Sequence, residues 1–580
     1  MNRVHRLYEL WSQDPYFDEE TRKELRELEG QEAEIEERFY RSLSFGTAGL
    51  RGILGAGTNR MNTYTVAQAT EGFARYIESL GAEACQRGMV ISYDCRICSP
   101  EFALTTALVF ASHGIHVRLV DELRPTPMLS FAVRHYNCVG GVMVTASHNP
   151  PQYNGYKAYG EDGGQLAPEA ADQVTALRDA ISDIREVHWI SEAEALDKGL
   201  LEYVGEDLDT AYMATLKPLV INWEAIRSQA DMKIVYTPLH GAGNKPVRRI
   251  LQEVGFRQVL VVPEQERPDG RFPTVKSPNP EVRSALEMGI ALAEREGAEL
   301  VIATDPDGDR TGLVIRLADG RYQVMTGNQI GILLMDYILR AKQAAGTLSD
   351  KSFCVTTVVS GRLPRLIAQH YGVQLFECLT GFKWIADLIK QYDEHGDMHF
   401  EFGFEESFGY LSGTAVRDKD AVVTSMLLAE MAASVRAAGK TLADSLQELY
   451  ARYGYAEEET ISVVREGKSG MELMARAMEQ LRERQGQAFP GLEISSLTDL
   501  QQGRQFFLAE GREAPIDLPR SNVLIYSLDG INFFCVRPSG TEPKIKIYFG
   551  VYGSDQQGCR EQLEALKQQV MAVLEGLLAV

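Results

Sequence analysis

The sequence predicts an α/β protein: several doubly wound α/β units followed by a smaller α+β domain. Three observations predict it. The chain has 580 residues, which is too long for one core and corresponds to roughly three to five domains. Short apolar runs alternate with helical patterns over most of the chain, which is typical of parallel sheets covered by helices. The last part changes to short strands separated by turn signals, which indicates an antiparallel α+β domain.

The first part of the chain is charged and follows a helical pattern, as in TRKELRELEGQEAEIEERFY over residues 21–40. We expect a solvated helical lead-in over residues 1–44 and, after it, the first α/β domain over residues 45–215. The elements predicted in that domain are strands over residues 89–92, 116–120 and 140–144 and a helix over residues 101–112.

The same alternation predicts two further α/β domains, over residues 216–320 and 321–440, because Pro/Gly-rich joints lie near residues 217, 319 and 438. The elements expected there are strands over residues 233–236, 259–262, 299–303, 352–357 and 399–402 and a helix over residues 246–254. The C-terminal α+β domain is predicted over residues 441–580. Its expected elements are strands over residues 523–527, 532–536 and 544–548 and a helix from about residue 555.

Charge and composition exclude several classes of partner. The formal net charge is −22, from 59 basic and 81 acidic residues, so a nucleic acid or an anionic membrane surface is not expected as a partner. No apolar run reaches the roughly 18 residues of a membrane span, and the N-terminus lacks the features of a signal peptide. We therefore expect a cytoplasmic protein, and an anionic small substrate would need a local basic pocket.

The eight cysteines are scattered along the chain. Cys95 and Cys98 form one CxxC pair, but no second pair completes a zinc site. We expect ordinary reduced thiols.

Polar loops follow four predicted strand ends, after the apolar runs at residues 140–144, 301–303, 376–378 and 400–402. The loops are at residues 145–150, 305–310, 379–384 and 403–407. In open α/β sheets, ligands bind outside the carboxyl ends of the strands. These four loops are therefore the candidate site.

The loop DPDGDR over residues 305–310 carries the sharpest signal. Three carboxylates this close repel one another at low dielectric, and a hard divalent cation removes that cost. An EF-hand does not fit, because its glycine belongs at position 6 and its glutamate at position 12, where this loop has Gly308 at position 4 and Arg316 at position 12. The pattern favours Mg²⁺ with open positions for a phosphate oxygen, and Arg310 adds a charged donor. A solvated acidic turn would also fit the spacing.

Two more loops are candidates for phosphate chemistry. The first, at residues 537–541, combines the bidentate donor Arg537 with two hydroxyls and a glycine, which suit an anion-binding nest. A plain hairpin turn would have a similar sequence. TASHNP, which contains Ser147, lacks the flanking glycines of a nucleophile elbow. Taken alone, it is more often a turn or a helix start than a nucleophile.

Together, six loops resemble those of the α-D-phosphohexomutase superfamily, in matching order and over nearly the whole chain. They are FGTAGLRG (residues 45–52), TASHNP (145–150), DPDGDR (305–310), TGFKW (380–384), GFEESFGY (403–410) and RPSGTEPK (537–544). The lead-in and GTNRMNTYTV (57–66) are most similar to the bacterial phosphoglucomutase branch, which also resembles phosphopentomutase and glucose 1,6-bisphosphate synthase.

The resemblance implies three doubly wound α/β domains and a C-terminal α+β domain around one cleft. It implies a phosphoserine at Ser147, which would ligate Mg²⁺ together with the three aspartates Asp305, Asp307 and Asp309. Arg51, Lys157 and His148 match positions near the transferring phosphoryl group, and either Lys157 or Arg51 would assist general acid–base transfer.

The implied reaction interconverts glucose 1-phosphate and glucose 6-phosphate, with glucose 1,6-bisphosphate as intermediate and activator. The implied sugar- and phosphate-binding residues are Arg51, Ser147, Arg310, Thr380, Gly381, Lys383, Glu405, Ser407, Lys419, Arg537, Ser539, Gly540 and Thr541. The motif GFEESFG favours glucose, but a mannose or pentose phosphate substrate and bisphosphate synthase activity stay open.

Two hypotheses from different classes of protein can be set beside the mutase. A phosphatase would share the metal and the serine but has no need of a second phosphate grip, which the loop at residues 537–541 supplies. A non-catalytic protein that binds sugar phosphates and Mg²⁺ would be expected to lack Ser147 or one of the aspartates, and this chain has them all. The sequence does not indicate an oligomeric state.

Overall fold

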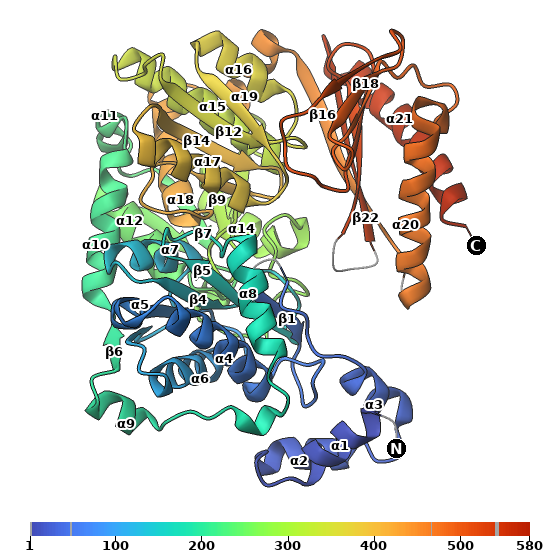
Figure 1. The fold of residues 1–580 in the computed structure, drawn as a ribbon. Helices are drawn as coiled ribbons and strands as arrows, with labels where there is room; N and C mark the ends of the chain where they lie inside the picture. The colour runs from blue at the N-terminus through green and yellow to red at the C-terminus, as the bar shows by residue number, and fades with distance from the viewer. Residues whose placement is uncertain (1–2, 47–48, 466, 540–543, 580) are drawn as a thin grey trace. The chain divides into compact units, whose positions relative to one another are not determined.

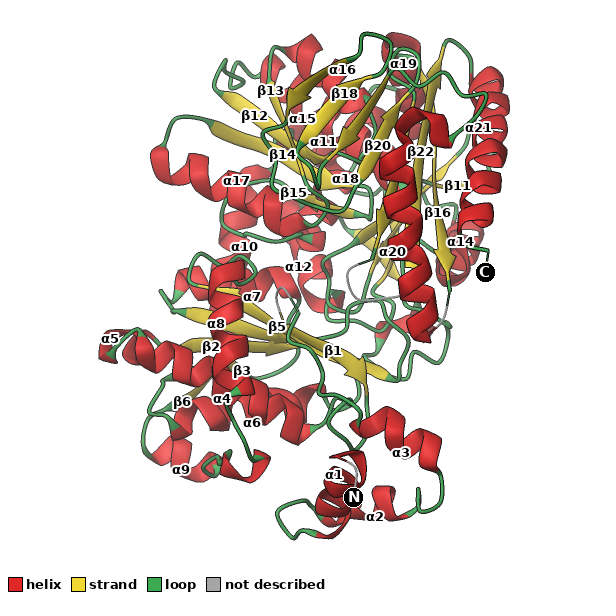
Figure 2. Cartoon of the chain, turned by 45° about the vertical axis from the view of Figure 1, so that its right-hand side comes forward, coloured by secondary structure: helices red, strands yellow, loops and turns green. Residues whose placement is uncertain are grey.

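The structure is a computed structural model that describes residues 3–46, 49–465, 467–539 and 544–579. Its elements build four β-sheets with helices packed around them (Figures 1 and 2). Three sheets belong to α/β regions and the fourth to a C-terminal β-rich region. The predicted fold class, with three α/β domains and a C-terminal α+β domain, is confirmed.

The lead-in forms three helices, α1 (Arg3–Gln13), α2 (Glu19–Arg26) and α3 (Glu32–Phe39). The expectation that they are simply solvated was wrong, because one face of this segment is buried around Trp11, which has no exposed surface. The Trp11 ring stacks on Phe17 at 4.4 Å and meets the Tyr64 ring edge-on at 5.6 Å. The buried cluster consists of Val4, Trp11, Phe17, Leu25, Ile35, Phe39, Ala56 and Tyr64.

The first sheet has the order β1-β5-β4-β2-β3-β6. Its strands are β1 (Gly49–Ile53), β2 (Met89–Tyr93), β3 (Val117–Val120), β4 (Gly140–Val144), β5 (Tyr153–Gly160) and β6 (Leu201–Val204). Its helices are α4 (Thr63–Ser79), α5 (Ala82–Arg87), α6 (Ser99–Ser112), α7 (Thr126–His135), α8 (Pro168–Asp179) and α9 (Glu192–Asp197), with a 3₁₀ turn at Ile184–Glu186. Strand order reverses at β2, so right-handed crossovers place α6 and α7 on opposite faces of the sheet (Figure 2).

The second sheet has the order β11-β10-β9-β7-β8. Its strands are β7 (Lys233–Thr237), β8 (Gln258–Val261), β9 (Leu300–Thr304), β10 (Thr311–Arg316) and β11 (Tyr322–Val324). The helices of this part are α10 (Glu206–Leu216), α11 (Trp223–Ser228), α12 (Asn244–Val254), α13 (Pro263–Glu266) and α14 (Arg283–Glu296), with a 3₁₀ turn at Lys217–Leu219.

The third sheet has the order β13-β12-β14-β15. Its strands are β12 (Ser352–Thr357), β13 (Gln374–Cys378), β14 (His399–Glu405) and β15 (Gly409–Leu411). The helices of this part are α15 (Gly327–Ala344), α16 (Leu363–Tyr371), α17 (Phe382–His395), α18 (Ala421–Ala437) and α19 (Leu442–Tyr453).

The fourth sheet is larger than the three predicted strands, because the strands before residue 523 were missed. Its order is β16-β22-β21-β20-β17-β18-β19. The strands are β16 (Tyr455–Val464), β17 (Ser496–Asp499), β18 (Arg504–Phe507), β19 (Arg512–Pro515), β20 (Leu524–Ser527), β21 (Phe533–Pro538) and β22 (Lys544–Gly553). Helices α20 (Gly467–Arg484) and α21 (Gln556–Leu577) and a 3₁₀ turn at Gln485–Ala488 complete the region.

The first two sheets are mixed and not purely parallel. Strand β4 pairs antiparallel with β5, and β9 pairs antiparallel with β10. The loops TASHNP and DPDGDR therefore each join two antiparallel neighbours, a connection that needs only a few residues. Both loops begin where a fully buried strand ends.

The chain separates into two compact units. Unit 1 comprises residues 1–330, 386–402 and 407–442, and unit 2 comprises residues 331–385, 403–406 and 443–580. Among the described residues, no single helix is long and apolar enough to cross a membrane, and the bent pair α18 and α19 satisfies that test only by combined length and composition. All eight cysteines are unbridged, as expected.

Candidate active site

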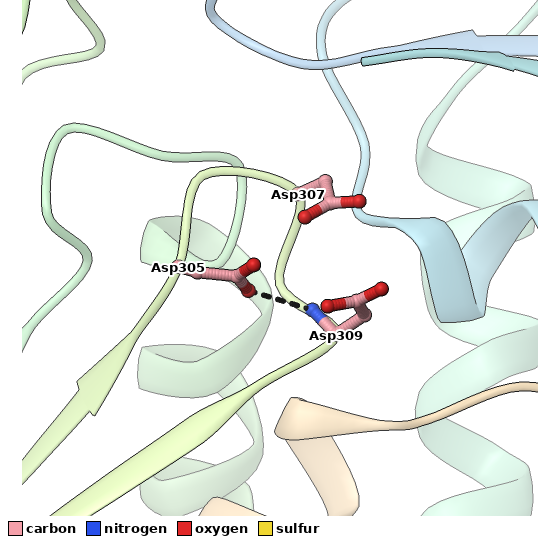
Figure 3. A group of neighbouring side chains, drawn as sticks. All are labelled: Asp305, Asp307 and Asp309. Atoms are coloured by element: carbon pink, nitrogen blue, oxygen red, sulfur yellow. Dashed lines mark hydrogen bonds between the residues drawn. The ribbon is translucent and has the colours of Figure 1, made fainter. Parts of the chain in front are cut away.

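The loop between β9 and β10 gathers three carboxylates (Figure 3). Asp305, Asp307 and Asp309 are at most 2% exposed, and each offers an oxygen within 4.8 Å of the others. The backbone N–H groups of Asp309 and Arg310 donate to Asp305 Oδ1 at 3.1 and 3.0 Å. Gly308 has a φ of +60°, which lets the loop turn this sharply. The sequence therefore folds locally so that the carboxylates converge.

This carboxylate set fits a hard divalent cation. Among the described residues, Asp307 Oδ1 and Asp309 Oδ1 are buried with no hydrogen-bond partner, although buried polar atoms normally have one. Burial, Asp307 and Asp309 hold the pKa of Asp305 well above its usual value. Burial alone would also raise the pKa of Asp307, but Lys157, the hydrogen bond with Asp305 and the charge of Lys419 together lower it. A cation bound by oxygen ligands would satisfy the two unpartnered oxygens and relieve the repulsion.

Ser147 lies at this carboxylate cluster. It is 4% exposed, and its hydroxyl donates to Asp305 Oδ2 at 2.8 Å. Its φ of +51° is in the left-handed region, which is uncommon for a serine. The Ser147 N–H donates to Thr145 Oγ1 at 2.8 Å. The sequence left open whether this serine only closes a turn; the structure directs its hydroxyl toward the predicted metal ligands.

His148 follows directly, with Nδ1 3.3 Å from the Ser147 hydroxyl. Burial first, and then the charges of Arg310 and Arg51, lower the pKa of His148 well below its usual value. The imidazole is therefore neutral at neutral pH.

Two lysines pair with the aspartates. Lys157, on β5, lies 2.7 Å from Asp307 Oδ2 and 3.5 Å from Asp309 Oδ2. Lys419 lies 3.2 Å from Asp309 Oδ2 and 3.0 Å from Asp418 Oδ1. Burial opposes the charge of Lys157, but Asp307 and Asp309 outweigh it and raise its pKa. The Lys157 ammonium therefore remains charged beside the cluster.

The remaining predicted residues of unit 1 lie on neighbouring elements. Arg51, on β1, donates through Nη1 to Asn149 Oδ1 at 3.3 Å. Arg310 forms an ion pair with Glu281. Ser407 precedes Phe408, whose carbonyl accepts from the N–H of Thr311 at the start of β10.

In unit 2, the loop before α17 and the first turn of that helix carry three predicted residues. Gly381 has a φ of +114°, which favours glycine. Thr380 Oγ1 is buried and has no hydrogen-bond partner within the described parts of the chain. Lys383 Nζ lies over the Trp384 ring at 4.9 Å, and burial lowers its pKa. An unpartnered hydroxyl in the loop and a cation in the first turn of α17 suit an oxygen-rich ligand.

Unit 2 also holds the predicted phosphate grip. The Ser539 N–H donates to the Lys544 carbonyl at 2.7 Å, which closes the ends of the loop, and Arg537 Nη1 donates to Tyr548 Oη at 3.4 Å. Gly540 and Thr541 lie outside the described residues. Burial and Glu405 raise the pKa of Glu406 to about 7, against the opposing effect of Lys546 and Arg537. Glu406, directly after β14, therefore interacts electrostatically with Arg537 of the predicted phosphate-binding loop.

The predicted residues divide between the two units, and those around Ser147 and the three aspartates are shown to lie together. The unit 1 group contains Arg51, Ser147, His148, Lys157, Asp305, Asp307, Asp309, Arg310, Ser407 and Lys419. The described part of the unit 2 group contains Thr380, Gly381, Lys383, Glu405, Arg537 and Ser539.

Sequence reasoning missed three residues that support the carboxylate and serine loops. Thr126 donates through Oγ1 to Asp307 Oδ2 at 3.0 Å. Arg96 donates to the carbonyl of Ser147 at 2.5 Å, and Asp94 accepts from Thr145 Oγ1 at 2.6 Å. The rule that polar loops at strand ends form the site would have found them, since they follow β2 and β3.

Comparison with known proteins gives matches over most of the chain. Family models described as phosphoglucomutase/phosphomannomutase, alpha/beta/alpha domains I, II and III, match residues 42–185, 210–318 and 326–453. A phosphoglucomutase of Staphylococcus epidermidis is 39% identical, covering 89% of this chain and 92% of that protein. A phosphoglucomutase of Staphylococcus aureus is 36% identical, covering 92% of this chain and 95% of that one.

Solved structures show the same fold at lower identity. The parafusin phosphoglucomutase of Paramecium, in its open form, superposes with a TM-score of 0.68 at 15% identity, covering 92% of this chain and 96% of that one. A phosphoglucomutase/phosphomannomutase family protein of Burkholderia thailandensis gives a TM-score of 0.64 at 18% identity, covering 92% of this chain and 97% of that one. The three family domains match in order along the chain, and the carboxylate and serine loops lie within the first two. The chain therefore belongs to the phosphoglucomutase/phosphomannomutase family.

Proposed function

We propose that this enzyme interconverts glucose 1-phosphate and glucose 6-phosphate by phosphoryl transfer through Ser147. The observation that carries the proposal is the Ser147 hydroxyl, buried and 2.8 Å from a carboxylate cluster with two unpartnered oxygens. The name phosphoglucomutase of relatives that are 36–39% identical over most of the chain supports the same sugar. Sugar phosphates are then the substrates, and glucose 1,6-bisphosphate is the intermediate and activator.

Asp305, Asp307 and Asp309 would hold Mg²⁺ together with phosphorylated Ser147. When bound, Mg²⁺ would neutralise charge on the phosphoryl group. Lys157, 2.7 Å from Asp307, and Arg51, which interacts electrostatically with the same carboxylate, add positive charge. Of these two, Lys157 is our candidate for proton exchange, because a guanidinium does not lose its proton in proteins. A cation held by Asp307 and Asp309 would offset the negative charges that raise the pKa of Lys157, and would so favour its neutral form.

Two transfers complete the reaction. In the first, the phosphorus–Oγ bond of phosphorylated Ser147 breaks, a bond to a sugar hydroxyl oxygen forms, and the hydroxyl proton passes to a basic side chain. In the second, the bond between the other phosphorus of the bisphosphate and its sugar oxygen breaks, a bond to Ser147 Oγ forms, and the proton is given back to that sugar oxygen. The enzyme therefore ends the cycle phosphorylated, as it began.

The second phosphate needs its own binding site. Arg537 and Ser539 are our candidates for that site, together with the predicted Gly540 and Thr541. The sugar would be held by Thr380, Gly381, Lys383, Glu405, Ser407 and Lys419, with Arg310 at the phosphoryl group. A single cleft formed by four domains with the boundaries given above, and a cytoplasmic location, remain predictions.

A test of the mechanism compares Ser147→Ala with Ser112→Ala. Ser112 lies in the same domain and donates to the Val109 carbonyl at 2.7 Å, away from the carboxylate cluster. After incubation with glucose 1,6-bisphosphate, intact-mass measurement should show one added phosphoryl group in the wild type and in Ser112→Ala, and none in Ser147→Ala. Turnover should be lost only in Ser147→Ala. Wild-type turnover in that variant would refute the phosphoserine mechanism.

The competing activities differ in their products. Glucose, mannose and ribose 1-phosphates assayed in parallel with Mg²⁺ should show the highest kcat/KM for the glucose compound. Preferred turnover of mannose or ribose 1-phosphate would assign another sugar, net accumulation of bisphosphate would indicate a synthase, and release of inorganic phosphate a phosphatase. Binding without turnover of any of them would indicate a non-catalytic protein.

A further inference from the structure

A buried arginine, Arg96, binds the backbone of the Ser147 loop. Arg96 is 1% exposed. Its Nη2 donates to the carbonyl oxygens of Ser147, at 2.5 Å, and Asn149. Its Nη1 donates to those of Pro150 and Tyr153 at 3.0 Å each. A guanidinium keeps its charge, and burying it is costly unless it is paired and hydrogen-bonded. Four carbonyls of one segment are thus fixed around one planar group.

The other side of Ser147 is fixed as well. Its N–H donates to Thr145 Oγ1 at 2.8 Å, and that hydroxyl donates to Asp94 Oδ2 at 2.6 Å. Asp94 Oδ2 also lies 3.4 Å from Arg96 Nε, so this ion pair links Thr145 and Arg96 in one network. Phe272 packs against the guanidinium with its ring centroid 5.0 Å away. Both backbone polar groups of Ser147 are therefore held by one buried network.

This network stabilises a conformation that serine does not favour. Ser147 has a φ of +51°, and a strained residue persists only where its surroundings enforce it. If φ returned to negative values, the side chain would leave the direction in which Oγ meets Asp305. Arg96 touches the backbone of the loop, so it acts on the reaction through Ser147.

We propose that Arg96 is a positioning residue that holds Ser147 in its left-handed conformation, so that Oγ stays in line for phosphoryl transfer. The proposal rests on the proposed role of Ser147. Displacement of a reacting atom by about 1 Å can reduce a rate roughly a hundredfold. In the proposed function, the sugar and the non-reacting phosphate are bound by other loops, so kcat should fall while KM changes little.

The test uses Arg96→Gln and Arg96→Lys, with Arg178→Gln as the matched control. Arg178 is also buried in the same domain and donates to a backbone carbonyl, that of Leu43, at 3.0 Å. The rate of Ser147 phosphorylation by glucose 1,6-bisphosphate, followed by rapid quench and intact mass, should fall about a hundredfold in both Arg96 variants. Lysine should not rescue it, because one ammonium cannot replace a planar fork. Arg178→Gln should lower the melting temperature and leave that rate at the wild-type value.

Wild-type phosphorylation rates in a folded Arg96→Gln protein would overturn the positioning role and leave the proposed function standing. Turnover by Ser147→Ala would overturn both. If the Arg96 variants do not fold, Thr145→Val tests the other half of the network, since it removes the acceptor of the Ser147 N–H at nearly constant volume. The same slow phosphorylation supports the proposal, and an unchanged rate contradicts it.

Discussion

At the scale of residues, three chemically identical side chains acquire different charge preferences within one loop. Asp305 has a raised pKa because it is buried beside two other carboxylates, whereas the pKa of Asp307 is lowered by Lys157. Sequence spacing could show that the carboxylates are close. It could not show that lysines from β5 and from residue 419 neutralise two of them.

We expect Asp307→Asn to weaken Mg²⁺ binding and to lower kcat. The variant replaces an anionic ligand by a neutral one and leaves Lys157 without its 2.7 Å partner. Truncating one partner of a buried charge pair costs roughly 3–5 kcal/mol. Calorimetric Mg²⁺ titration and kcat measured against Mg²⁺ concentration check it.

The matched control is Asp319→Asn, in an exposed turn where the carboxylate pairs with Arg321. It should bind Mg²⁺ and turn over like the wild type. Full wild-type activity in the presence of EDTA would show that the carboxylate loop has no metal role.

At the scale of elements, helix α18 begins at an aspartate that is costly to ionise. Asp420 accepts from the N–H groups of Val422 and Val423 at 2.9 and 3.0 Å and from Tyr212 Oη at 2.7 Å. Burial nevertheless raises its pKa to about 6 from 3.8. The Asp420 carboxylate thus accepts from free N–H groups at the start of α18, while its burial disfavours its negative charge.

Because the folded pKa exceeds the unfolded one, the folded state binds more protons between pH 4 and 6. This group's contribution to stability is therefore greatest below pH 4 and is lost as the pH rises to about 6. The difference of about two pKa units corresponds to roughly 3 kcal/mol. Asp420→Asn keeps the cap acceptor without the charge, so its stability relative to the wild type should rise from pH 4.5 to 7. Melting temperatures of both proteins across this range test it, and a constant difference would contradict the raised pKa.

The lead-in helices depend on their aromatic cluster. Trp11 is fully buried against Phe17 and Tyr64, so Trp11→Ala should destabilise this segment by about 3–5 kcal/mol. The control is Trp223→Ala, because Trp223 is 38% exposed. Limited proteolysis should cleave the lead-in of Trp11→Ala much faster than that of the control. Equal cleavage rates would show that the cluster does not hold the segment.

At the scale of the whole molecule, a chain of net charge −22 has to bind an anionic substrate. The proposed answer is local: basic side chains are concentrated in the candidate loops of both units. A mutase with one serine must hold the non-reacting phosphate elsewhere in both directions of the reaction. Arg537 is our candidate for that task.

Arg537→Ala should impair both directions, raise KM and lower kcat, with a loss of about 2–4 kcal/mol in kcat/KM. Remote binding energy would no longer hold the reacting hydroxyl in line. Ser147 should still become phosphorylated, and bisphosphate should escape more often. Forward and reverse kcat/KM and bisphosphate release measure these effects.

Arg512→Ala is the control in the same region, because Arg512 pairs with Glu510 and lies over the Phe507 ring. It should behave like the wild type. Unchanged KM and kcat in Arg537→Ala would remove this arginine from the active site.

Much of the fold could be predicted from the sequence because the periodicities of strands and helices depend on residues close together in the chain. The predicted strand over residues 89–92 is observed as β2, and the predicted helix over residues 246–254 as α12. Strands β16 to β19 were missed because they are short or paired with distant segments, as β16 is with β22. The lead-in was misjudged because Trp11 packs against Tyr64, a partner 53 positions away, which no local pattern specifies.

By itself, the sequence determined the α/β class, the loops at the strand ends and the identity of the carboxylates and the serine, because these follow from residue type and short spacing. Tertiary structure alone decided that Ser147 meets Asp305, 158 positions away, and that Arg96, in the loop after β2, holds the serine loop. It also decided which aspartates are neutralised by lysines. The physical reason is that hydrogen bonds and charge interactions depend on distance in space, and strand pairing across the sheets sets that distance.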